Sequence, residues 1–410
     1  MNYIDEFFQL DPIFRLLFSV AYVPFAAGLL VKIWQAHDIN YIHIMEVSYK
    51  DRMNPYQLWK IASMIAFCWL TVQYLSLQEI SAIYEDQPNV DFRGAASGEE
   101  PVTAAGRTAL TAYKQVIGIA AVVLQAVLWL NPARMLYRRL RFGVFSALGN
   151  VVTAPFGGVH FKAYLLAEIL TDCTIQLEDI GKVTTYLLLG NWDLTLVSAS
   201  QSQTVGGHTP PAALKWWLYF VSFIGAWFRM QQNLKKWLVY DHGEQAFNAL
   251  KYFFLVIGPV CAIVYYETHI KPFKYMYYTF KAIGSAFKVF WDFYFDWGLF
   301  RGTEEHNRFL RDEMKFAPAF YYTCMVFDVI GLFFWAIVIG LYEWTTPENT
   351  NEAIGSLEFF NNVMWITWAE LIVMAVRRTV WILIRLENEY FNNFESFRDI
   401  VTVPPIKKAH

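Results

Sequence analysis

The sequence is divided into long apolar segments joined by short polar connections, and this alternation leaves few folds open to the chain. Segments of about twenty residues, the length that a helix needs to cross the hydrocarbon core of a bilayer, recur from end to end. The 410 residues are 56% hydrophobic and only 17% charged. Apolar residues clustered in this way are typical of polytopic helical membrane proteins. We therefore predict an all-α fold, a bundle of about nine transmembrane helices.

The boundaries of the spans follow from the apolar segments. The fourth and ninth are long enough to tilt or to extend beyond the bilayer. The segment Phe142–Phe156 is too short and too often interrupted by glycine for a span, so we interpret it as an interfacial or re-entrant piece. The nine predicted spans are Ile13–Trp34, Leu58–Leu77, Ala109–Leu130, Val159–Leu189, Ala212–Gln232, Ala246–Tyr266, Phe273–Trp297, Pro318–Tyr342 and Leu357–Glu389.

The basic residues of the connections gather on one side of the predicted membrane. The other side has only Arg93, Arg107 and Lys271. Basic connections face the cytosol in multispanning proteins, so this bias predicts a lumenal amino terminus over residues 1–12 and a cytosolic tail over 391–410. Residues 13–390 then form a single transmembrane domain.

The last predicted span carries two adjacent arginines, Arg377 and Arg378, in a stretch otherwise suited to lipid. A charge at the bilayer centre costs roughly 2.5–3.5 kcal/mol on insertion scales, so both should face the protein interior or water. Arg377, Trp381 and Arg385 recur at four-residue steps and share one helix sector. The planar guanidinium suits a phosphate or a carboxylate. One interpretation is therefore an oxyanion held in a membrane pathway; the alternative is arginines that snorkel at a helix end or pair with glutamates.

The sequence carries few signs of other chemistry. The eight histidines show no HxxxH or HExxH grouping, which argues against a metal site, and no GxxxxGK[ST] stretch indicates ATP binding. A membrane enzyme using Glu168 or Asp172 as a general base is disfavoured, because no nucleophile or histidine pair accompanies them. We expect no enzyme activity, no cofactor and no nucleic-acid partner.

Several sequence blocks, in order, make the chain resemble the EXS family. This family comprises eukaryotic phosphate exporters and a Golgi protein of yeast whose loss causes defective retention of ER proteins. Several blocks that occur in the same order as in the family indicate membership more specifically than any single block does. They are Asn40–Glu46 with Asn54-Pro55, Thr153–Phe156, Leu166–Glu168, Leu177–Asp179, Asn248–Tyr252, Trp291-Asp292, Asp296–Phe300, Phe309–Glu313, Asp328–Ile330, Arg385–Glu389 and Asn392–Ile400.

The resemblance implies a fold and a function. The exporters carry an amino-terminal SPX domain, which senses inositol pyrophosphates, and an extra span before the matched region. Neither fits in the twelve residues ahead of Ile13, so the chain resembles the short Golgi type, without SPX regulation. It implies a transporter or channel that returns inorganic phosphate, a by-product of lumenal glycosylation, to the cytosol through a cationic pathway.

The resemblance also implies which residues line that pathway. In the exporters, basic side chains from several helices hold phosphate, helped by tyrosine, tryptophan and acids. The matching positions here are Lys251, Tyr252, Arg377, Arg378, Asp292, Asp296, Trp335, Glu168 and Asp179. Among them Glu168 is aspartate in the exporters. Thr171 replaces an asparagine, and Leu218 and Leu332 stand where the exporters have arginines.

A lysine stripe could replace the two lost cations. Lys274, Lys281 and Lys288 recur at seven-residue steps in the seventh span, hence on one face, with Asp292 one turn beyond Lys288. We assign Lys281 and Lys288 to the pathway. The alternative is that Lys274 snorkels to the interface and that Asp292 merely neutralises Lys288.

The carboxyl-terminal sequence suggests a sorting signal. Lys407 and Lys408 stand third and fourth from the end and resemble the dilysine motif read by the vesicle coat that returns membrane proteins to early secretory compartments. An alternative function is therefore an interaction protein that, with a cytosolic sorting adaptor, retains Golgi glycosyltransferases and ER residents. The other partners that we expect are inorganic phosphate and membrane lipids. The sequence leaves open whether the chain forms a homodimer.

Overall fold

The computed structural model describes residues 11–47, 52–85, 138–157, 160–189, 212–303, 309–345 and 357–393, with scattered residues between 116 and 131. Within these residues all regular structure is helical, which confirms the predicted all-α class. The elements are α2 (Asp11–Ala36), α3 (Tyr41–Ile44), α4 (Pro55–Glu85), α6 (Arg138–Val152), α7 (Phe161–Leu170), α8 (Thr174–Leu189), α9 (Ala212–Tyr240), α10 (Glu244–Thr268), α11 (Lys271–Trp291), the π-helical η3 (Asp292–Asp296), α12 (Pro318–Leu332), α13 (Phe334–Thr345) and α14 (Leu357–Asn392).

Four stretches of helix in the described residues are long and apolar enough to cross a membrane. They are Asp11–Ala36, Pro55–Glu79, Glu244–Thr268 and Pro318–Gly340. The protein is thus a helical, multi-pass membrane protein, whereas the count of nine spans stays a prediction. The third predicted span, 109–130, lies for the most part outside the described residues.

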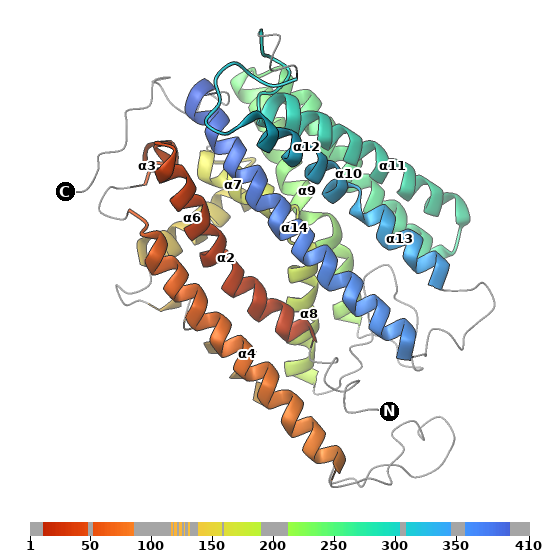
Figure 1. The fold of residues 1–410 in the computed structure, drawn as a ribbon. Helices are drawn as coiled ribbons and strands as arrows, with labels where there is room; N and C mark the ends of the chain where they lie inside the picture. Colours follow the sequence, from red (N-terminus) through yellow and green to blue (C-terminus); the bar gives the residue numbers. More distant parts are fainter. Residues whose placement is uncertain are drawn as a thin grey trace.

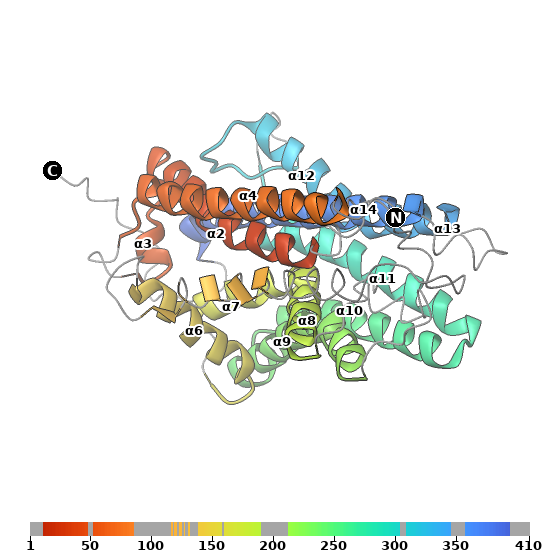
Figure 2. The ribbon, with the colours of Figure 1, turned by 90° about the horizontal axis from the view of Figure 1, so that it is seen from below.

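Helix α14 runs through the middle of the molecule and organises the rest (Figure 1). Helices α2, α12 and α13 pack against it, and α2 also packs on α4 and α8. Helices α9, α10 and α11 pack in chain order. Seen from below, α2 and α4 lie on one side of the bundle and α6, α7, α8 and α9 on the other (Figure 2). A helix of 36 residues, uninterrupted from end to end, thus carries the arginine pair through the centre.

The predicted span 159–189 is not one helix but two. Helix α7 ends at Leu170 and α8 begins at Thr174. The amides of Thr171, Asp172 and Cys173 bond to carbonyls three residues earlier, at 3.2, 3.0 and 3.3 Å. This tight closure ends the helix, and short polar side chains such as threonine and aspartate favour it because they offer the backbone other hydrogen bonds.

Two further predicted spans are also irregular. The span 318–342 is divided at Phe333 between α12 and α13, and the end of the span 273–297 is the π-helical η3. Irregular backbone at membrane depth is tolerated where it is buried in protein or lines water, and π-helical turns are frequent at functional sites. The three irregular segments therefore mark the region in which a site should be sought.

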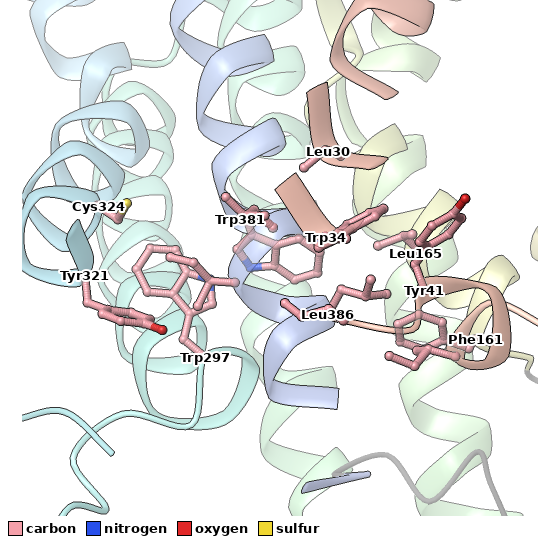
Figure 3. Close-up of a cluster of buried hydrophobic side chains, with 14 of the residues drawn as sticks. Leu30, Trp34, Tyr41, Phe161, Leu165, Trp297, Tyr321, Cys324, Trp381 and Leu386 are labelled. Atoms are coloured by element: carbon pink, nitrogen blue, oxygen red, sulfur yellow. The ribbon is translucent and has the colours of Figure 1, made fainter. Parts of the chain in front are cut away.

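A large apolar cluster holds the carboxyl-terminal half of α14 in place. Its buried members include Trp34 of α2, Tyr164 of α7, Tyr321 of α12 and Trp381 of α14. Labelled side chains from several helices lie on both sides of α14 (Figure 3). Because large aromatic side chains bury 150–250 Å² each, this cluster fixes the register of α14 against its neighbours.

Candidate functional site

The arginine pair is buried inside the bundle. Arg377 is 1% exposed and Arg378 is 5% exposed, which excludes the interpretation that they snorkel to an interface. The Arg377 guanidinium donates to the carboxylates of Asp172 at 2.5 Å and Asp328 at 2.9 Å, and lies 3.5 Å from Asp292. One guanidinium on α14 thus meets acids from three other segments, two of them irregular.

The second arginine shares an acid with the first. Arg378 Nε donates to Asp172 Oδ2 at 2.6 Å, and another of its nitrogens donates to the Thr171 hydroxyl at 3.2 Å. Glu168 lies 3.5 Å away, and the guanidinium sits 4.7 Å from the centre of the Trp381 ring. Stacking on an indole fixes the plane of this guanidinium.

The lysine stripe divides between two environments. Lys288 Nζ donates to Asp172 Oδ1 at 3.2 Å and lies 3.3 Å from the Thr171 hydroxyl, so it joins the arginine pair. Its acid is Asp172 and not Asp292, contrary to the alternative interpretation. Lys281 donates to the Tyr277 hydroxyl at 2.9 Å and lies 5.1 Å from the Trp335 ring.

The other two lysines of the stripe, Lys274 and Lys281, lie against aromatic rings. The Trp335 indole donates to Ser285 at 3.0 Å, on the same helix as Lys281. Lys274 lies 5.7 Å from the Tyr278 ring. Lys281 and Trp335 therefore contact each other but make none of the contacts that join the arginines to Lys288.

Glu168 connects the arginine pair to a second group of cations. Arg229 donates to it at 2.8 Å, and the Tyr252 hydroxyl donates to the same oxygen. Lys251 is fully buried between the rings of Tyr252, at 4.5 Å, and Trp291, at 5.1 Å. In the part of the chain that the structure describes, its Nζ has no hydrogen-bond partner. This ammonium is held by rings and by surrounding charge alone.

A third group lies two turns further along α14. Arg385 donates to Glu389 at 3.0 Å and to the Tyr164 hydroxyl at 3.2 Å, and lies 3.5 Å from Asp296. Tyr164 in turn donates to Asp296 at 3.0 Å. The sector predicted from the four-residue spacing of Arg377 and Arg385 therefore faces the interior over its whole length.

Asp179 lies apart from the arginine pair. Both of its oxygens accept from Arg15 of α2, at 2.8 and 2.7 Å, and Lys182 lies 3.8 Å away. Arg15 also contacts Asp11, which accepts from the Trp368 indole at 2.7 Å. The structure thus brings together Arg377, Arg378, Lys288, Asp292 and Glu168, but places Asp179 in a separate ion cluster.

Leu218 and Leu332, which the resemblance aligns with arginines of the exporters, are buried apolar residues. Leu218 packs with Leu214 and Tyr219, and Leu332 ends α12.

Sequence reasoning missed three residues of the site. Asp172 was considered only as a general base of a disfavoured enzyme, Asp328 only as part of a sequence block, and Arg229 not at all. All three are buried or nearly so and paired with a cation or an acid of the site. The same signal was available for each of them. A charged side chain inside a membrane span is energetically costly, so such a residue usually has a functional role.

Comparison with known proteins identifies the family to which the chain is similar. The chain matches the EXS family over residues 10–391. It is 27% identical over 402 residues to solute carrier family 53 member 1 of Homo sapiens, covering 93% of this chain and 50% of that protein. The xenotropic and polytropic retrovirus receptor 1 homologs of Xenopus laevis and Danio rerio are 27% and 26% identical over 402 and 393 residues, with the same coverage. The chain spans about half the length of these relatives.

Proposed function

The chain belongs to the EXS family, and we propose that it is a phosphate transporter or channel of the Golgi membrane rather than an enzyme. It would return inorganic phosphate, a by-product of lumenal glycosylation, to the cytosol. The observation that carries the proposal is the convergence of Arg377, Arg378 and Lys288 on one carboxylate within the bundle. The name of the human relative, a solute carrier, supports a transport role.

The number of buried cations favours a functional over a structural explanation. Replacing a buried ion pair by apolar residues of similar volume is often neutral or stabilising, so an ion network of this size is a poor way to hold a fold together. Ionisable residues in spans typically mark ion and substrate pathways. Of the buried cations among the described residues, six belong to this network: Arg229, Lys251, Lys288, Arg377, Arg378 and Arg385.

The acids among these cations would allow phosphate both to bind in the proposed pathway and to leave it. Carboxylates between the cations keep the charge nearly balanced before phosphate arrives, which avoids a bare cluster of positive charge in the membrane. Conduction needs binding that is favourable enough for entry and weak enough for release, and several sites in sequence serve this better than one tight clamp. The groups around Lys251, the arginine pair and Arg385 would be such successive sites.

The proposal is tested with purified protein in liposomes loaded with radiolabelled phosphate. The wild type should release the label, and the double variant Arg377→Ala with Arg378→Ala should abolish release. The matched control is Arg138→Ala with Arg139→Ala, an adjacent arginine pair that is exposed at the start of α6. Release that persists without the buried pair would refute the cationic pathway.

The Golgi location and the interaction alternative need a test in cells. A tagged chain should co-localise with Golgi markers, with its amino terminus lumenal and its carboxyl terminus cytosolic. Lys407 and Lys408, which lie outside the described residues, should be needed for this location if they form a dilysine signal. If the transport-dead double variant still restored retention of glycosyltransferases, the interaction function would be favoured.

A further inference from the structure

The break between α7 and α8 carries one acid, Asp172, into the middle of the cationic cluster. The break is set tightly against α9, because a Cβ on Gly225 would lie 2.6 Å from the Leu170 carbonyl oxygen and 2.9 Å from Thr171 Cα. Only a residue without a side chain allows this approach. The backbone at Asp172 is therefore held in place by its packing against α9.

Both carboxylate oxygens of Asp172 are used. Oδ2 accepts from Arg377 at 2.5 Å and from Arg378 at 2.6 Å, and Oδ1 accepts from Lys288 at 3.2 Å. The Thr171 hydroxyl is 3.3 Å from Oδ1. Three cations from two helices thus converge on one small anion. This is the donor set that a phosphate oxyanion would require, since guanidinium forks bind carboxylate and phosphate in the same way.

Asp172 is also the most accessible acid around the pair. Its side chain is 10% exposed, against 2% for Asp292 and Glu168 and 1% for Asp328. The other acids lie in helical segments, whereas Asp172 lies in a three-residue turn. Of the four carboxylates, it can leave the cations with the least disturbance of surrounding helix.

We propose that Asp172 is a tethered competitor of the substrate: its carboxylate occupies the donors of Arg377, Arg378 and Lys288, and phosphate binds them by displacing it. The proposal rests on the proposed function and deepens it by naming the residue that sets the affinity for phosphate. A tethered group acts at high effective concentration, so phosphate binding is weakened. On release the carboxylate returns and neutralises the cations, which keeps the emptied site from holding uncompensated charge.

The variant Asp172→Asn tests this directly, because it removes the charge and keeps the shape. Full-length protein in detergent is titrated with inorganic phosphate at constant ionic strength, and binding is followed by isothermal titration and by the shift in melting temperature. The competitor is lost in the variant, so its dissociation constant for phosphate should fall about tenfold, which corresponds to about 1.4 kcal/mol. The control Glu267→Gln removes an acid from a peripheral pair with Lys215 and should bind as the wild type does.

Because its three cations lose their shared acid, the variant should be less stable than the wild type when phosphate is absent. Phosphate should then raise its melting temperature more than that of the wild type, because the substrate takes over the role of the carboxylate. Binding equal to or weaker than that of the wild type, or instability that phosphate does not relieve, would overturn the proposal. A wild type that binds no phosphate would instead refute the proposed function, and this inference with it.

Discussion

The substitution Gly225→Ala probes the packing that positions the α7–α8 break. The added methyl group would lie 2.6 Å from the Leu170 carbonyl oxygen, which is 0.8 Å closer than the 3.4 Å at which ordinary contact begins. The obstructing atoms are backbone, so no side chain can turn aside. Overpacking of this kind typically destabilises by about 1–3 kcal/mol. The alternative to that strain is a shift of the break, and with it of Asp172, by nearly an ångström.

Two measurements separate these responses. Melting temperature in detergent reports the strain, and phosphate release from liposomes reports the shift of Asp172 away from the arginines. We expect Gly225→Ala to lower the melting temperature and to change the rate of release at low phosphate. Gly149→Ala is the matched control, since a Cβ there meets nothing within 4 Å, and alanine favours a helix by up to about 1 kcal/mol. Wild-type values in both assays for Gly225→Ala would refute the argument that close packing on α9 positions the break.

Three further substitutions follow from the contacts. Gly331→Ala would place a methyl group 2.6 Å from Cδ of Arg377, and should reduce phosphate release in liposomes while all charges remain. Arg229→Ala leaves the buried Glu168 without its closest cation, and should lower the free energy of unfolding by about 3–5 kcal/mol in chemical denaturation, as removal of one partner of a buried pair does. Asp179→Asn should destabilise through its pair on α2 but leave the concentration for half-maximal release unchanged; an altered value would show that this separate cluster belongs to the path.

The local part of the site could be predicted from the sequence. Two arginines in an apolar span have to face the interior because lipid cannot solvate them, and four-residue spacing places Arg377 and Arg385 on the same sector. Seven-residue spacing also singled out Lys288, whose ammonium donates to the acid that the arginine pair shares. These predictions depend only on helical geometry and on the expense of a charge in a membrane, and both are properties of a short stretch of sequence.

The partners of those cations could not be predicted. Asp172 and Arg377 are separated by 205 residues, and Arg229 and Glu168 by 61. Such pairs are set by how the helices pack and not by any local pattern. The break at Asp172 was missed for a related reason, since the apolar residues on both sides of it read as one long span and only the polar residues between them indicated otherwise.

The cations and the acids around the pair differ in how they are held, and this difference bears on transport. Arg377 and Arg378 lie on α14, whose 36 residues form one uninterrupted helix at the centre of the bundle. The acids Asp172 and Asp292 lie in a turn and in a π-helical segment. The Asp172 carboxylate can turn away from the cations without breaking a helix, whereas a shift of α14 would disturb its whole apolar cluster. Passage of an anion should therefore move the Asp172 carboxylate past stationary arginines, and the substitutions at Asp172 and Gly225 act on that one step, the first on the charge that moves and the second on the backbone that positions it.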